Sequence, residues 1–214
     1  MLPMYSLFVK GGPVMWPLLF TSIVSLTVVV DRFIFVLRQE MKADPEAIEA
    51  ILLHARTDAF SRAIERSGET KDPIAKVLAY GLTHRDASFS NALVQAASEE
   101  LKRYQRGISV LDTVVTLAPL LGLLGTVTGM IRSFGLLGVQ ELGTPMAITG
   151  GIAEALIATA YGLTIAIVTL IPLNFLNNYS NSMKYRLEKA GTDLELALSS
   201  LKASSAYEAT GKLR

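Results

Sequence analysis

Two long apolar stretches joined by a short segment constrain the fold of this chain more than any other feature. They cover residues 113–137 and 145–175, and each contains a single charged residue, Arg132 in the first and Glu154 in the second. At about 1.5 Å per helical residue, each stretch is long enough to cross a hydrocarbon layer of about 30 Å. Both are too long and too apolar for a hairpin in water, so the sequence predicts two membrane-spanning helices.

A third apolar run lies near the amino terminus, at residues 14–37. It is long for a signal peptide and no small-residue cleavage site follows it, so we expect an uncleaved first span. The composition agrees with a membrane protein. Half of the residues are hydrophobic, the mean hydropathy is +0.39, and the 18% of charged residues cluster outside the three apolar runs.

The segment between the first and second runs is charged, amphipathic and rich in alanine. Asp44-Pro45 and Asp72-Pro73 each combine an N-cap residue with a proline at the first helical position, which predicts two helix starts. We expect about three short helices, then a last helix that begins at 88–91 and continues past Gly107 into the second span. The chain after residue 176 is expected to continue the third span as an amphipathic helix, with its last ten residues irregular.

The distribution of basic residues predicts the topology. Residues 38–106 contain 11 Lys and Arg and the tail after residue 178 contains six, whereas residues 135–144 contain none. By the positive-inside rule, we expect the helical domain and the tail to be cytoplasmic and the amino terminus to lie outside.

The predicted fold class is therefore an all-α membrane protein with three transmembrane helices, of which the long second and third extend into a cytoplasmic helical domain. The expected organisation is an external segment at 1–13, transmembrane helices at 14–37, 111–137 and 146–176, a cytoplasmic helical domain at 38–110, a short external loop at 138–145 and a cytoplasmic helical tail at 177–214.

Small residues recur along the second and third spans at helical spacing. Such residues let helix backbones approach closely, which drives helix association in lipid. We therefore expect both spans to pack against other helices and not against lipid alone, and we expect Gly125→Leu or Ala155→Leu to prevent close helix approach and to break a ring of subunits. The expected packing positions are Gly122, Gly125, Gly129, Gly151, Ala155 and Gly162, with Thr159 and Ala166 on the same stripe as the last three.

Three motifs resemble those of the ExbB/TolQ/MotA family of proton-channel motor subunits. They are KGGPVMWPL at 10–18, APLLGLLGTVTG at 118–129 followed by Ser133-Phe134, and GIAEALIATAYGL at 151–163. The last two are long and specific, and the resemblance is greatest to ExbB, with TolQ close behind. One departure is that the third span of the family commonly continues as Ala-Ile-Pro, whereas here the proline is Pro172.

The resemblance implies a pentamer in the bacterial inner membrane, with the second and third helices around a pore that holds two single-span partners of the ExbD/TolR type. It implies that an aspartate of the partner carries the proton and that Thr126 and Thr159 face it. The implied function is to use proton motive force to energise TonB-dependent transport across the outer membrane, through a TonB-like protein. A TolQ-like envelope motor and a non-conducting scaffold for single-span partners are the alternatives.

The residues themselves leave the roles of these positions open. Glu154 inside an apolar helix either lies near the ion path or bonds across helices to fix the oligomer, since an acid in the membrane is costly without a function or a partner. The hydroxyls of Thr126 and Thr159 either serve the ion path or bond carbonyls of their own helices.

Other chemistry is not indicated by the sequence. No catalytic set of nucleophile, base and orienting residue is visible, so we expect no enzyme activity. His54 and His84 lack metal-ligand spacing and the chain has no cysteine, so neither a metal site nor a cofactor is expected. The net charge of +1 gives no reason to expect nucleic acid as a partner. Membrane lipid is an expected partner.

Overall fold

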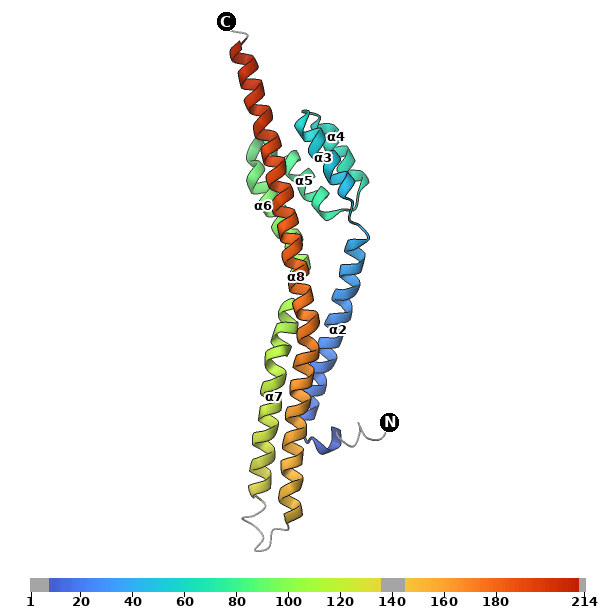
Figure 1. The fold of residues 1–214 in the computed structure, drawn as a ribbon, viewed down its shortest axis with the longest axis vertical. Helices are drawn as coiled ribbons and strands as arrows, with labels where there is room; N and C mark the ends of the chain where they lie inside the picture. The colour runs from blue at the N-terminus through green and yellow to red at the C-terminus, as the bar shows by residue number, and fades with distance from the viewer. Residues whose placement is uncertain (1–7, 136–144, 212–214) are drawn as a thin grey trace. The chain divides into compact units, whose positions relative to one another are not determined.

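A computed structural model describes residues 8–135 and 145–211, and these form helices and no strand (Figure 1). The helices are α2 (Met15–Glu40), α3 (Pro45–Arg56), α4 (Phe60–Glu69), α5 (Pro73–Thr83), α6 (Arg85–Gln105), α7 (Ile108–Gly135) and α8 (Pro145–Gly211). Among the described residues, three helical stretches are long and apolar enough to cross a membrane: Met15–Glu40, Ser88–Gly135 and Thr149–Leu201. The predicted fold class is confirmed.

The chain divides into two compact units. The first consists of Met1–Phe33 and Gly107–Leu176, and the second of Ile34–Arg106 and Asn177–Arg214. Within the first unit, α7 and α8 run side by side, and α2 lies alongside α8 (Figure 1). This unit contains the apolar parts of all three long helices.

The buried face of α7 explains why it lies so close to α8. Its buried positions recur every three or four residues, and they become small along the helix: Leu111, Val114, Ala118, Gly122, Gly125, Gly129 and Ser133. The outward face keeps large apolar side chains such as Leu123, Val127 and Ile131. This is the arrangement expected where lipid offers no hydrophobic drive, because close backbone approach then supplies the packing energy.

The second unit is a helical domain with its own apolar core. Ile51, Ile74, Leu78, Leu82 and Leu194 are almost completely buried there, and burial of each such side chain stabilises the fold by roughly 1.5–3 kcal/mol. The first four come from α3 and α5, and Leu194 comes from α8. The third long helix therefore forms part of this core as well as part of the first unit.

Both predicted helix starts in the second unit are confirmed. Asp44 accepts a hydrogen bond from the amide of Ala47 at 3.0 Å, and Asp72 accepts from the amides of Ile74 and Ala75 at 2.7 and 3.2 Å. The expected start of the last helix at 88–91 corresponds to a kink at Ser88, where the backbone leaves helical geometry within α6.

Two details of the prediction were wrong. The last helix does not pass Gly107 without a break, because Gly107 adopts a φ of +82°, a left-handed conformation that ends α6 at Gln105 and lets α7 begin at Ile108. The prediction that the last ten residues are irregular was also wrong for residues 205–211, which continue α8 as a helix. The predicted external loop at 138–145 lies outside the described residues except for Pro145, where α8 begins.

Candidate ion-path site

The close packing of α7 on α8 is the structural basis of the candidate site. A Cβ atom added at Gly162 would lie 2.5 Å from the carbonyl oxygen of Ala118 and 3.1 Å from the Cα of Gly122. One added at Gly122 would lie 3.1 Å from the Cα of Thr159. The contact at Gly162 leaves no room for a side chain, and at Gly122 the backbone of α8 would have to move by a few tenths of an ångström to admit one.

The remaining packing positions also lie at this contact. A Cβ added at Gly129 would lie 2.9 Å from the Cβ of Ala155, one added at Gly151 would overlap the hydroxyl of Ser133, and one added at Gly125 would overlap the Cβ of Ala158. Within this chain, the two predicted stripes therefore face each other. Ala158, which is completely buried, was missed because the i, i+4 spacing used for α8 skips the i+3 position.

Thr159 forms a hydrogen bond between the two helices. Its Oγ1 donates to the carbonyl oxygen of Gly122 on α7 at 2.9 Å. In a regular helix the amide of Thr126 donates to this same carbonyl, so the bond places Thr159 about one helical turn from Thr126. The structure thus brings the two threonines to the same level of the helix pair.

Thr126 has a different partner. Its hydroxyl donates to the carbonyl oxygen of Leu123 in its own helix at 2.6 Å. This is the local bond that threonine commonly forms in helices, and it leaves the oxygen able to accept a further hydrogen bond. The two threonines therefore have different roles in the isolated chain, since only Thr159 links α7 to α8.

Glu154 is not brought together with the threonines. It precedes Thr159 by five residues, which is about 7.5 Å along the helix axis and places the two side chains on different faces of α8. Its Oε1 accepts a hydrogen bond from the guanidinium of Arg132 on α7 at 2.8 Å, and the Glu154 side chain is 22% exposed against 53% for Arg132. The only charged residues of the two apolar stretches form an ion pair with each other.

A third segment meets this ion pair. Gly12, before α2, has a φ of +73°, and a Cβ there would overlap the carboxylate of Glu154. The Glu154 carboxylate therefore lies against the backbone of the amino-terminal segment as well as against Arg132. The pairing was missed in the sequence, although opposite charges at similar distances from the loop joining two spans could have suggested it.

Among the side chains that the structure describes, no group of three His, Asp or Glu residues is placed to hold a metal ion. The groups available for function in the helix pair are hydroxyls, backbone carbonyls and one ion pair.

These features define a multi-pass membrane protein in which a tightly packed helix pair presents hydroxyls and an ion pair. The MotA/TolQ/ExbB proton channel family matches residues 69–189, more than half of the chain, and the chain belongs to that family. The matched region contains less than half of the second unit, all of α7 and the glycine-rich part of α8. The resemblance stated from the motifs is confirmed.

Several curated relatives carry ExbB names. The biopolymer transport protein ExbB-like 1 of Synechocystis sp. is 36% identical over 196 residues, covering 88% of this chain and 76% of the relative. The ExbB homolog of Methanothermobacter thermautotrophicus is 28% identical over 171 residues, covering 78% and 60%. ExbB of Xanthomonas campestris is 34% identical over 110 residues, covering 51% and 44%.

Proposed function

We propose that this chain is the ring-forming subunit of a proton-driven motor in the bacterial inner membrane, and that it energises TonB-dependent transport across the outer membrane. Membership of the proton channel family supports a channel subunit, and the ExbB names of its relatives favour this process over a TolQ-like one. The observation that carries the proposal is the placement of Thr126 and Thr159 within one turn of each other on the packed pair of α7 and α8.

The proposed complex is a pentamer of this chain around two copies of an ExbD/TolR-type single-span partner. Thr126 keeps acceptor capacity on its hydroxyl, so it can bond a protonated carboxyl of the partner or a water beside it. Thr159 holds α8 against α7 at the same level. Proton transfer through the partner would then be transmitted to a TonB-like protein.

The proposed orientation has the amino terminus in the periplasm and the carboxyl terminus in the cytoplasm. It rests on the concentration of Lys and Arg in residues 38–106 and in the tail. Because the chain has no cysteine, single cysteines introduced at Lys10 and Tyr185, both exposed, can be labelled in intact cells with an impermeant maleimide. We expect labelling at position 10 only, and labelling at position 185 instead would reverse the topology.

Proton flux in liposomes tests the function. The chain is reconstituted with and without its co-purified single-span partner, and decay of an imposed pH gradient is measured. We expect flux only with the partner, and we expect Thr126→Val to lower it at least tenfold while the complex still assembles. Thr128→Val is the matched control, because Thr128 also bonds carbonyls of its own helix. Flux that is absent under all conditions would favour a passive scaffold, and flux without the partner would favour a self-sufficient channel.

A further inference from the structure

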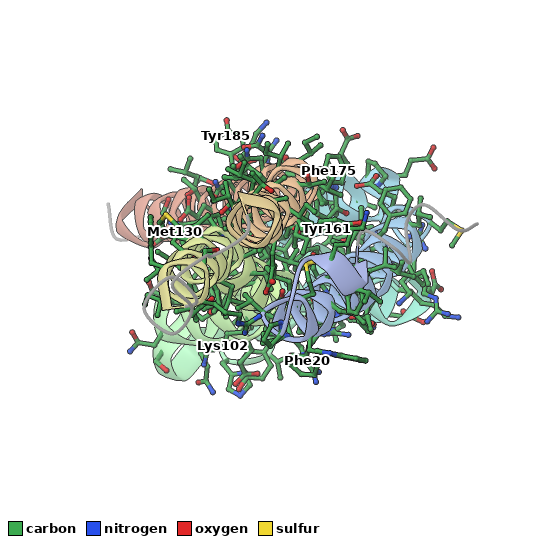
Figure 2. All side chains as sticks on the ribbon, turned by 90° about the horizontal axis from the view of Figure 1, so that it is seen from below. Phe20, Lys102, Met130, Tyr161, Phe175 and Tyr185 are labelled. Atoms are coloured by element: carbon green, nitrogen blue, oxygen red, sulfur yellow. The ribbon has the colours of Figure 1, made fainter. Side chains whose placement is uncertain are left out.

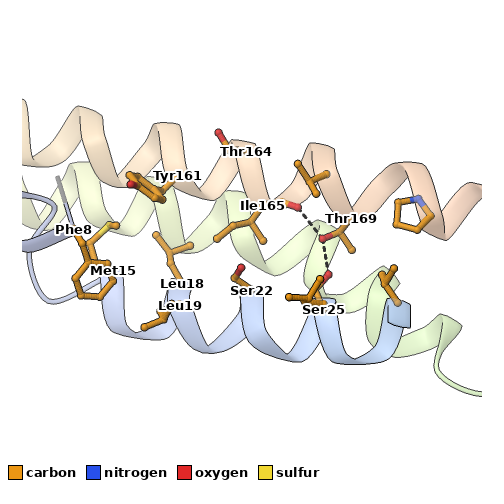
Figure 3. Close-up of a pocket in the computed structure, with 14 residues that line it drawn as sticks. Phe8, Met15, Leu18, Leu19, Ser22, Ser25, Tyr161, Thr164, Ile165 and Thr169 are labelled. Atoms are coloured by element: carbon orange, nitrogen blue, oxygen red, sulfur yellow. Dashed lines mark hydrogen bonds between the residues drawn. The ribbon is translucent and has the colours of Figure 1, made fainter. Parts of the chain in front are cut away.

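A groove lies between α2 and α8 inside the membrane-spanning part of the first unit (Figure 3). Its volume is about 390 Å³. Met15, Leu18, Leu26 and Val29 line it from α2, and Tyr161, Ile165, Val168 and Pro172 line it from α8, together with Phe8, Leu19, Ser22, Ser25, Thr164 and Thr169. We propose that this groove binds one acyl chain of a phospholipid.

The groove is long and narrow, which suits an acyl chain. Its lining residues extend from Met15 to Val29 on α2 and from Tyr161 to Pro172 on α8, which is about 21 Å and 16 Å along the respective helix axes. A volume of 390 Å³ over that length gives a mean cross-section of about 20 Å². An unbranched hydrocarbon chain is narrow enough to lie along a groove of this section.

The length also fits a lipid tail. Half of a hydrocarbon layer of about 30 Å is about 15 Å, which is close to the length of the α8 side of the groove. Both walls belong to segments long and apolar enough to span a membrane, so the surrounding medium supplies acyl chains at high concentration.

The chemistry of the walls matches an uncharged ligand. None of the lining residues is charged, and most are aliphatic or aromatic. Three of the five lining hydroxyls have partners within the protein: Thr164 donates to the carbonyl of Ala160 at 2.7 Å, Thr169 donates to that of Ile165 at 2.8 Å, and Ser25 is 2.7 Å from the hydroxyl of Thr169. Because these polar groups are already bonded, the groove favours an apolar ligand over an ion or a polar solute.

One end of the groove has features of a membrane interface. Phe8 closes this end, and its ring packs edge-on against Trp16 with 5.4 Å between centroids. Trp16 is 67% exposed, and tryptophan is enriched at the level of lipid headgroups. Lys10 is exposed two residues beyond Phe8, so a cation is available near the position of a lipid phosphate. The geometry therefore suits a phospholipid whose tail enters beside Phe8 and runs along α2.

Photolabelling in detergent micelles tests this site. The detergent-solubilised protein receives a phospholipid that carries a diazirine in one acyl chain, at increasing mole fractions in the micelle, and adducts are mapped by peptide mass spectrometry. Leu26 and Val168 in the groove should label saturably. Phe20, which points outward from α2 and is 69% exposed, should label in proportion to the mole fraction (Figure 2).

A substitution that fills the groove provides a second test of the site. Ser22→Leu adds bulk to the groove wall and should reduce adducts at Leu26 and Val168 at least fivefold, with those at Phe20 unchanged. Thr27→Leu is the matched control, because Thr27 is exposed on the same helix and does not line the groove. If Ser22→Leu fails to assemble, the saturation curve of the unmodified protein still decides. Labelling in the groove that stays proportional to the mole fraction would overturn the proposal. Labelling of Phe20 with none in the groove would also overturn it, and would indicate that another copy or a partner protein covers the groove.

Discussion

Gly162 and Gly150 lie in the same helix, but a methyl group added at each would meet different surroundings. At Gly162 it would lie 2.5 Å from a backbone oxygen of α7, whereas at Gly150 nothing lies within 4 Å. A backbone atom cannot rotate away as a flexible side chain can. Gly162→Ala must therefore push α7 and α8 apart, and such overpacking costs roughly 1–3 kcal/mol.

The first prediction compares these two alanine variants. Gly162→Ala should lower the Tm of the detergent-solubilised protein, because it separates the packed helices. Gly150→Ala should leave Tm unchanged or raise it, because alanine is favoured over glycine in a helix by about 1 kcal/mol. Differential scanning fluorimetry of both variants measures this. Equal Tm values would mean that α7 and α8 are not held at the distance described.

The second prediction separates the structural roles of the two threonines. Thr159→Val removes the bond to the carbonyl of Gly122, and an average intramolecular hydrogen bond contributes about 1 kcal/mol. Thr126→Val removes a bond within one turn of its own helix, so it should change Tm less. Thr164→Val is the control for a local bond on α8. A smaller change in Tm for Thr159→Val than for Thr126→Val would contradict the assigned contacts.

At the scale of helices, the side chain of Asp72 connects the starts of α3 and α5 in the second unit. Besides capping α5, its Oδ2 accepts a hydrogen bond from the amide of Asp44 at 2.9 Å, and its side chain is almost completely buried. One carboxylate therefore satisfies the first amides of α5 and also holds the residue that caps α3. Asp44 itself accepts from one amide, that of Ala47.

The third prediction follows from this difference. Asp72→Ala leaves three buried or half-buried amides without their acceptor and should lower stability by about 2–3 kcal/mol, more than the roughly 1 kcal/mol expected for Asp44→Ala. Asp72→Asn should be intermediate, because its amide oxygen can still accept from Ile74 but its NH₂ cannot accept from Asp44. Limited proteolysis of the segment 57–72 measures the effect. Equal cleavage rates in the two alanine variants would contradict the linking role.

The helices that could be predicted are those that local chemistry determines. The apolar lengths predicted the spans, and the Asp-Pro pairs at 44 and 72 predicted two helix starts. About three short helices were expected before the last one, in agreement with α3, α4 and α5, but the position of the break between α3 and α4 was not predicted. This break includes a φ of 60° at Asp58, a conformation that aspartate tolerates but that its presence in the sequence does not indicate. Gly107 was visible in the sequence, yet a single glycine in a helical pattern does not show whether the helix tolerates it or breaks there.

The candidate site was predictable at the level of residue types and not at the level of partners. Glu154 was identified as the one acid in an apolar helix, and Thr126 and Thr159 were identified through the resemblance of their motifs to those of the family. Their bonds to Leu123, Gly122 and Arg132 depend on the rotation of α7 against α8, which tertiary packing decides. The α2–α8 groove was likewise not predictable, since it depends on how side chains from helices distant in sequence fill the space between them.

At the scale of the whole molecule, the ion pair between Arg132 and Glu154 connects three separate parts of the chain. Arg132 belongs to α7, Glu154 to α8, and the carboxylate also lies against Gly12 before α2. Removal of one partner leaves the other charge without compensation in an apolar part of the protein, which is more costly than removal of both. Substitution of both residues together therefore distinguishes a role of Glu154 in holding these segments from a role in the ion path.

The fourth prediction uses a double-mutant cycle on this pair. Glu154→Gln and Arg132→Gln should each lower the Tm of the assembled complex, and the double variant should lose less than the sum, with a coupling of roughly 0.5–3 kcal/mol as expected for residues in contact. Proton flux with the partner present is measured in the same three variants. If Glu154 acts by holding α7, α8 and the amino-terminal segment together, flux in the double variant should recover with stability, because no charge is then left unpaired. Recovery of stability without flux would assign the ionised carboxylate to the proton path, and additive losses in Tm would show that the two side chains do not interact in the assembled protein.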